Sequence, residues 1–156
     1  MKNEILLILI LALLLTCPLA RASEGAEGAH ETPPEIVARY TGTWTSGDFV
    51  LELRYVDGDF QCGAMKPIGG DERTVWEYDV GWYDAALDAV LCVSASCSKQ
   101  RYDPSTKQYR ETDWALDDMT PATFTLGEDG DTLVVSGLLR VDKPLTLKRQ
   151  DPTDAD

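Results

Sequence analysis

Hydrophobic and polar residues alternate along much of the chain between residues 40 and 149. Two stretches show this most clearly: Phe49, Leu51, Leu53 and Tyr55 in the first, and Trp76, Tyr78, Val80 and Trp82 in the second. Successive side chains of an extended chain point to opposite sides, so a period of two is typical of a strand with one buried face. We therefore predict strands at residues 49–56 and 76–82.

Turn-forming residues separate these strands from several further short apolar segments. They include Asp57-Gly58, Asp103-Pro104 and Gly130-Asp131, which are typical of tight turns. The spacing predicts about 8–10 strands, roughly one every 8–12 residues, and no long amphipathic helix interrupts them. We predict an all-β fold, a single antiparallel up-and-down β-barrel over residues 40–149, with a β-sandwich as the alternative.

The first 22 residues have the three parts of a secretory signal peptide. A start containing Lys2 leads into an apolar run at residues 5–15 and then into Ala20-Arg21-Ala22, an A-x-A cleavage site. The run of about eleven residues is too short to cross a bilayer, which needs about 20. We predict a secreted or periplasmic protein that begins at Ser23 and has no transmembrane segment. The alternative is a lipoprotein signal in which Cys17 carries the lipid, although Thr16 and Pro18 suit such a site poorly.

The remaining chain divides into a spacer, one domain and a tail. Residues 23–31 are small and acidic and predict a disordered spacer. Thr32-Pro33-Pro34-Glu35 then resembles a capping box with proline at the first helical position, and Gly42 is a stop signal for this short helix. We place the β-barrel domain at residues 32–149 and a disordered tail at residues 150–156.

The chain is strongly acidic, with 14 Lys and Arg against 27 Asp and Glu and a net charge of −13. Removing residues 1–22 takes away Lys2, Arg21 and Glu4 and brings the net charge to −14. Binding to phosphate groups needs clustered Lys and Arg. We therefore predict that the protein binds neither nucleic acid nor an anionic membrane surface, and that it is a monomer.

Three cysteines, Cys62, Cys92 and Cys97, remain after such cleavage. If Ser94-Ala95 forms a two-residue turn between two strands, Cys92 faces Cys97 at a Cα separation of about 4.5 Å. That separation is at the short end of the disulfide range of about 4.4–6.8 Å. We predict a Cys92–Cys97 disulfide and a buried free thiol at Cys62, with a bridge from Cys62 to either of the others as the alternative.

Two segments at the ends of the domain are similar to a known family. Gly42-Thr43-Trp44 follows the short helix and opens the first strand, and Arg149 comes just after the last strand. This arrangement resembles the lipocalin-type (calycin) β-barrels, and the whole pattern is similar to small secreted bacterial β-barrels. The resemblance implies that Trp44 closes one barrel end beneath Arg149 as a cation–π pair. Avidin-like barrels begin with a similar Gly-x-Trp.

Sequence motifs for catalysis or metal binding are weak. The single histidine, His30, lies in the acidic spacer, where it cannot serve a Ser–His or Cys–His nucleophile held by the fold. Ser96 and Lys99 match S-x-x-K, but the partner motifs of those enzymes are missing. The acidic turns lack the spacing of a calcium loop, and one histidine without a Cys-x-x-Cys pair does not make a zinc site. We predict a non-catalytic protein without metal or cofactor.

Aromatic side chains are the best candidates for ligand binding. Five of them form the predicted set that lines the barrel lumen: Tyr55, Trp76, Tyr78, Trp82 and Trp114. They would bind a small apolar ligand, or they would only fill the barrel as ordinary core. We predict a binding module for a small apolar ligand. The alternative is an extracellular protein-interaction or hydrolase-inhibitor domain, with exposed apolar groups such as Ile68 and Met119 in the loops at residues 67–73 and 116–121.

Overall fold

The computed structural model describes residues 31–117 and 119–150 as one short helix and nine strands. In chain order these are α2 (Pro34–Tyr40), β1 (Gly42–Ser46), β2 (Phe49–Val56), β3 (Asp59–Gly69), β4 (Glu72–Asp84), β5 (Ala89–Asp103), β6 (Gln108–Asp117), β7 (Ala122–Leu126), β8 (Thr132–Ser136) and β9 (Leu145–Arg149). The predicted signal peptide, almost all of the predicted spacer and most of the predicted tail lie outside the described residues. Within the described residues, no helix has the length and apolar character needed to cross a membrane.

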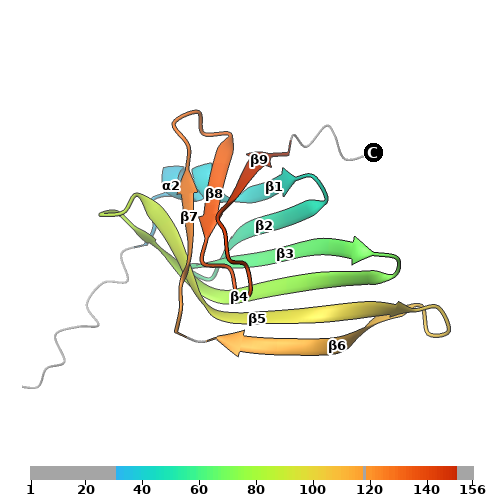
Figure 1. Ribbon diagram of the computed structural model, residues 1–156. Coiled ribbons are helices and arrows are strands. Elements are labelled where there is room, and N and C mark those ends of the chain that lie inside the picture. Colours follow the sequence, from blue (N-terminus) through green and yellow to red (C-terminus); the bar gives the residue numbers. More distant parts are fainter. Residues whose placement is uncertain (1–30, 118, 151–156) are drawn as a thin grey trace, which may run out of the picture. The chain divides into compact units, whose positions relative to one another are not determined.

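Eight of the nine strands close into a barrel (Figure 1). Each strand is antiparallel to its neighbours, and the order around the barrel is β1, β2, β3, β4, β5, β7, β8 and β9, with β9 returning to β1. The register at the closing seam sets Trp44 opposite Arg149. The predicted antiparallel up-and-down barrel is confirmed.

The ninth strand, β6, lies outside this ring. The first residues of β5 pair with β7, whereas residues 95–103 pair with β6. β6 and β7 therefore follow one another along the same edge of β5. Figure 1 shows β6 at the lower margin of the sheet, where β3, β4 and β5 extend past the barrel, with no strand beyond it.

The barrel end next to α2 is closed by a tryptophan. Trp44 is completely buried, and its Nε1 donates a hydrogen bond of 3.1 Å to the carbonyl oxygen of Tyr40. The Arg149 guanidinium lies 4.1 Å from the centre of the Trp44 ring, and its Nη1 donates to the carbonyl oxygen of Thr41 at 2.9 Å. A Cβ on Gly42, whose φ is +133°, would lie 3.0 Å from the same Nη1. The structure thus brings Gly42, Trp44 and Arg149 together at this end of the barrel.

The predicted helix start is partly wrong. The predicted capping box has Thr32 at the N-cap and Pro33 as the first helical residue, but the helix begins one residue later, at Pro34, where a missing N–H is tolerated. The N-cap is Pro33, and no side chain caps the helix. Thr32 is used differently, since its backbone N–H donates to the hydroxyl of Tyr55 at 3.3 Å.

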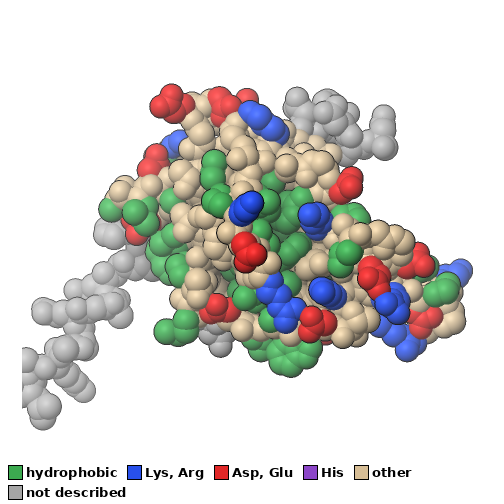
Figure 2. Space-filling model, in the orientation of Figure 1, with side chains coloured by type: hydrophobic (Ala, Val, Ile, Leu, Met, Phe, Trp, Pro, Cys, Tyr) green, Lys and Arg blue, Asp and Glu red, His purple; other side chains and the backbone are tan. Residues whose placement is uncertain are grey.

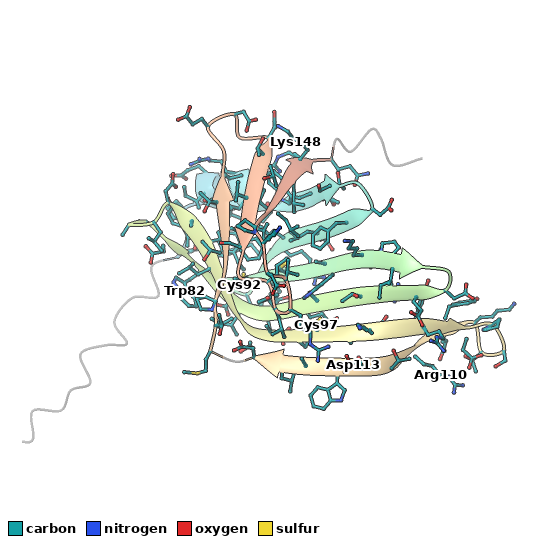
Figure 3. The ribbon with its side chains drawn as sticks, viewed as in Figure 1. Trp82, Cys92, Cys97, Arg110, Asp113 and Lys148 are labelled. Carbon is teal, nitrogen blue, oxygen red and sulfur yellow. The ribbon has the colours of Figure 1, made fainter. Side chains whose placement is uncertain are left out.

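The predicted Cys92–Cys97 hairpin is also wrong. Residues 89–103 form one continuous strand that pairs with β4 on both sides of Ser94, so no turn separates the two cysteines. Five residues of extended strand place their Cα atoms about 16 Å apart, far beyond disulfide reach. Figure 3 shows Cys92 and Cys97 at two points along β5, and Cys62, Cys92 and Cys97 are all free thiols. The local irregularity at Ser94 is a kink with φ +58°, within the strand.

The turn between β7 and β8 is organised by one carboxylate. Asp129 accepts hydrogen bonds from the Thr132 hydroxyl at 2.7 Å and from the backbone N–H groups of Asp131 and Thr132 at 3.0 and 2.9 Å. Lys148 of β9 lies 3.3 Å from the same carboxylate. Mainly because of the bond from the Thr132 hydroxyl, the pKa of Asp129 is lowered to about 2. The charged form of Asp129 therefore holds this turn.

Candidate ligand-binding mouth

The barrel end opposite α2 opens into a pocket of about 580 Å³. The turn between β1 and β2, the strands β3 and β4, and the loop between β8 and β9 supply its lining. The lining residues are Ser46, Asp48, Phe49, Lys66, Trp76, Arg140, Val141, Asp142, Lys143 and Leu145. Alternation along β2 and β4 buries Phe49 and Trp76, and thereby turns these two side chains towards the barrel interior.

Two aromatic rings form the apolar base of the pocket. The centroids of Phe49 and Trp76 are 5.6 Å apart and their planes are inclined by 51°, within the range of favourable aromatic pairs. Trp76 is 95% buried in the structure, yet it contributes to the pocket lining. The buried indole and phenyl groups are therefore within reach of a ligand that enters the mouth.

The loop between β8 and β9 is anchored over the barrel interior by two hydrogen bonds. Trp76 Nε1 donates to the carbonyl oxygen of Leu139 at 2.8 Å, and the N–H of Leu139 donates to the hydroxyl of Tyr78 at 2.8 Å. Leu138 beside it is buried. Burial raises the pKa of Tyr78 to about 12, so its hydroxyl stays neutral. One wall of the mouth is thus fixed to two side chains of the lumen.

The mouth carries positive charge in an acidic protein. Lys66, Arg140 and Lys143 line it together with Asp48 and Asp142. Figure 2 shows Lys and Arg side chains on both sides of a hydrophobic patch in the middle of this face. Arg140 is partly neutralised, because its Nη1 lies 2.7 Å from the carboxylate of Asp113 on β6. Lys66 and Lys143 make no ion pair within 4.0 Å among the described residues.

The structure places the five aromatic residues that were predicted to line the lumen in different environments. Trp76 and Tyr78 lie in the buried core. Tyr55 is half-buried, with its ring centroid 5.0 Å from that of Phe60. Trp82 and Trp114 do not line the lumen, since 44% and 62% of their surfaces are exposed. Figure 3 shows Trp82 near the β4–β5 turn, away from the mouth.

A change of face within β4 explains the position of Trp82. Trp76 and Tyr78 are buried, but the next buried residue is Gly81, and both Asp79 and Val80 are exposed. A shift by one residue moves every later side chain to the opposite face of a strand. Trp82 consequently lies outside the barrel. Trp114 lies outside because its strand, β6, is not part of the ring.

Several residues of the mouth were not among the predicted site residues. Arg140 and Lys143 lie in the loop between β8 and β9, Lys66 lies near the end of β3, and Leu145 is the first residue of β9. The only sign of this site in the sequence was a few isolated Lys and Arg residues in a chain of net charge −13, and these residues are far apart in the sequence. Only the barrel closure brings residue 66 next to residues 140–145.

The cysteine side chains are poorly suited to nucleophilic chemistry. Cys62, Cys92 and Cys97 are buried. Burial raises the pKa of Cys92 to about 12 and also raises those of Cys62 and Cys97. A thiolate is the reactive form, and it is strongly disfavoured at these positions near neutral pH.

Neither a metal centre nor a known relative identifies the site. In the part of the chain that the structure describes, no three His, Cys, Asp or Glu side chains are grouped as metal ligands. No family model, curated protein or solved structure matches this chain. The functional interpretation therefore depends on the geometry of the barrel itself.

Proposed function

We propose that the protein is a non-catalytic binding module whose barrel mouth takes a small ligand with an apolar body and an anionic group. The observation that carries this proposal is the pocket of about 580 Å³, with aromatic side chains at its base and cations at its rim. Pockets for small molecules typically have about 300–1,000 Å³ and combine an apolar lining with a few polar groups.

The parts of the pocket suit the two parts of such a ligand. An apolar body would remove its own surface and that of Phe49, Trp76 and Leu145 from water, which contributes about 25 cal/mol per Å² of apolar area. An anionic group would lie at the rim near Lys66 and Lys143. Binding an anion here is favourable because these ammonium groups make no other ion pair among the described residues.

The proposal also covers where the protein works and which family of proteins it resembles. The signal-peptide pattern of residues 1–22 supports a protein that works outside the cytoplasm. The stacking of Arg149 on Trp44 supports the lipocalin-like interpretation. The neutral, buried thiols support a protein that binds rather than catalyses.

Isothermal titration with three probes of equal chain length tests this function: dodecanoate, dodecanol and dodecyltrimethylammonium. We expect dodecanoate to bind most tightly and the cationic probe most weakly. The double variant Lys66→Gln/Lys143→Gln should weaken dodecanoate binding about tenfold, because exposed charge pairs contribute about 0.2–1 kcal/mol each. Dodecanol binding should change little.

Lys107→Gln is the matched control, since Lys107 is exposed in the turn between β5 and β6 and does not line the pocket. Equal loss of dodecanoate binding in the control, or no binding of any of the three probes, would contradict the proposed function.

A second candidate function is favoured by exposed apolar side chains outside the mouth. Met119 is 86% exposed, and Ile68 is half-exposed on the extended part of the sheet. Both were predicted as exposed if the protein is an interaction domain. Docking of a partner protein on the extended sheet is therefore the alternative to small-ligand binding.

A further inference from the structure

Arg140, in the loop between β8 and β9, has a backbone conformation that is costly for its residue type. The N–H of Val141 donates to the carbonyl oxygen of Leu138 at 2.9 Å, which closes a four-residue turn with Arg140 at its third position. The φ of Arg140 is +63°, and a positive φ at this position of a turn favours Gly or Asn. Residues held in such conformations are often found at ligand sites. The Arg140 side chain is therefore a candidate for a role in binding.

Arg140 lines the mouth next to a fixed piece of backbone. The N–H of Leu139 donates to the hydroxyl of Tyr78, and its carbonyl oxygen accepts from Trp76 Nε1, each at 2.8 Å. The side chain of Arg140 is itself 41% exposed, and the residue belongs to the pocket lining. Its guanidinium is therefore within reach of an anionic group on a ligand in the mouth.

The guanidinium of Arg140 is already bound by β6, the strand outside the ring. Nη1 donates to Oδ2 of Asp113 at 2.7 Å, and Nη2 donates to the carbonyl oxygen of Trp114 at 3.4 Å. Asp113 thus accepts a single N–H, and the second contact is long. An arginine can give one carboxylate two parallel N–H bonds, which is the stronger arrangement. The partners on β6 leave this arrangement unused.

The pair of Arg140 and Asp113 is suited to exchange. The Asp113 side chain, which Figure 3 shows on β6, is 49% exposed, and exposed ion pairs are weak. The pKa of Asp113 is lowered mainly by the hydrogen bond from Arg140 and also by the charge of Lys99. Lys99 lies directly opposite Asp113 in the register of β5 and β6. The Asp113 carboxylate therefore keeps water and a positive neighbour when Arg140 turns to another anion.

We propose that Asp113 is a specificity-determining residue of the mouth, because it competes with the ligand for Arg140. A ligand carboxylate has two oxygens in one plane, takes two N–H bonds of the guanidinium and displaces Asp113. A neutral group leaves the pair of Arg140 and Asp113 intact. This inference rests on the proposed function, and it makes the anionic group of the ligand a carboxylate that Arg140 contacts together with Lys66 and Lys143.

Isothermal titration with dodecanoate and dodecanol tests the competition, in about 0.15 M salt, where the Debye length is about 8 Å. Asp113→Asn should tighten dodecanoate binding about two- to fivefold, because it frees Arg140 from an exposed charge pair. Arg140→Gln should weaken dodecanoate binding, and adding Asp113→Asn to it should change nothing further, since the two residues act as a unit. Arg140→Lys keeps the charge but lacks the paired donors, and should also weaken dodecanoate binding. Dodecanol binding should be the same in all variants.

Glu111→Gln is the matched control, since it makes the same change of charge on the same strand. Glu111 makes no ion pair within 4.0 Å among the described residues and does not line the mouth. Its substitution should change dodecanoate binding little. Equal tightening in Glu111→Gln, or in Asp113→Asn on the Arg140→Gln background, would show a general charge effect and overturn the proposal.

The remaining outcomes separate this inference from the function on which it rests. Unchanged or weaker dodecanoate binding in Asp113→Asn overturns the competition, and weaker binding would mean that Asp113 holds Arg140 in place for the ligand. Wild-type affinity for dodecanoate in Arg140→Lys overturns the two-bond recognition of a carboxylate. Absence of binding of both probes to the wild-type protein contradicts the proposed function itself, and this inference with it.

Discussion

Replacing Gly81 by alanine should destabilise the barrel although it adds only one methyl group. Gly81 lies in β4 opposite Cys92 of β5 and is buried. A Cβ at this position would lie 2.5 Å from Cys92 Sγ, 2.7 Å from the carbonyl oxygen of Phe60 and 2.8 Å from that of Leu91. Its φ is not in the left-handed region, so the cost of the methyl group is entirely steric.

The expected loss follows from these three contacts. Overpacking costs about 1–3 kcal/mol, and we expect a value near the upper end because two of the three atoms are backbone oxygens held by the sheet. Alanine also restricts the unfolded chain, which offsets about 0.4–1 kcal/mol. The free energy of unfolding of Gly81→Ala should therefore fall by about 2 kcal/mol.

Urea denaturation followed by circular dichroism measures this change. Gly63→Ala is the matched control, because Gly63 lies in β3 with φ outside the left-handed region and its Cβ would meet only Arg54 Nη2, at 3.9 Å. The control should be unchanged or more stable by up to about 1 kcal/mol. In Gly81→Ala/Cys92→Ala the closest clash is removed, so the loss should be smaller than the sum of the two single losses. A loss below about 1 kcal/mol for Gly81→Ala, or one equal to that of the control, would refute this reasoning.

Three further predictions concern the closed end, the acidic turn and the thiols. Trp44→Ala should lower the free energy of unfolding by about 3–5 kcal/mol. The control Trp114→Ala should lower it by less than about 1 kcal/mol. Equal losses in urea denaturation would contradict the role of Trp44 in closing the barrel end. Asp129 has a folded pKa of about 2 against its ordinary 3.8. The stabilisation that charged Asp129 gives the folded protein is therefore present above about pH 4 and is lost as the pH falls towards 2. In the variant Asp129→Asn, the free energy of unfolding should decrease less steeply over this acid range. An NMR titration in which Asp129 titrates near its ordinary pKa would contradict the assignment. Iodoacetamide at pH 8 should modify none of Cys62, Cys92 and Cys97 in the folded protein and all three in urea, and a bridged pair in a non-reducing peptide map would disprove this. Because folding raises the pKa of Cys92 from 9.0 to about 12, stability should also fall as the pH rises above about 9 towards 12.

The sequence alone predicted the architecture because the barrel follows from local patterns. Alternation along residues 49–56 and at Trp76 and Tyr78 specifies strands with one buried face, and turn residues separate them at regular intervals. An antiparallel meander with short turns closes its edges most simply as a barrel. Trp44 and Arg149 were assigned from a resemblance, and the structure brings them together at 4.1 Å.

Sequence reasoning failed where a single residue changed the geometry of a long strand. Ser94 looks locally like a turn, but pairing of β5 with β4 on both sides holds it as a kink within the strand. The prediction that Cys92 faces Cys97 failed for this reason. The change of face between Tyr78 and Gly81 likewise placed Trp82 outside the barrel. One inserted irregularity reverses every later side chain, and the pattern of residues does not show where it occurs.

The ligand-binding mouth and the edge of β6 were decided only by the tertiary structure. Lys66, Arg140 and Lys143 become neighbours because eight strands close into a ring, and this closure depends on pairings between residues far apart in the chain. β6 lies outside the ring because β7 occupies the place beside the first residues of β5. The sequence therefore determined which segments are strands. Long-range pairing determined which strand remained free and which side chains met at the mouth.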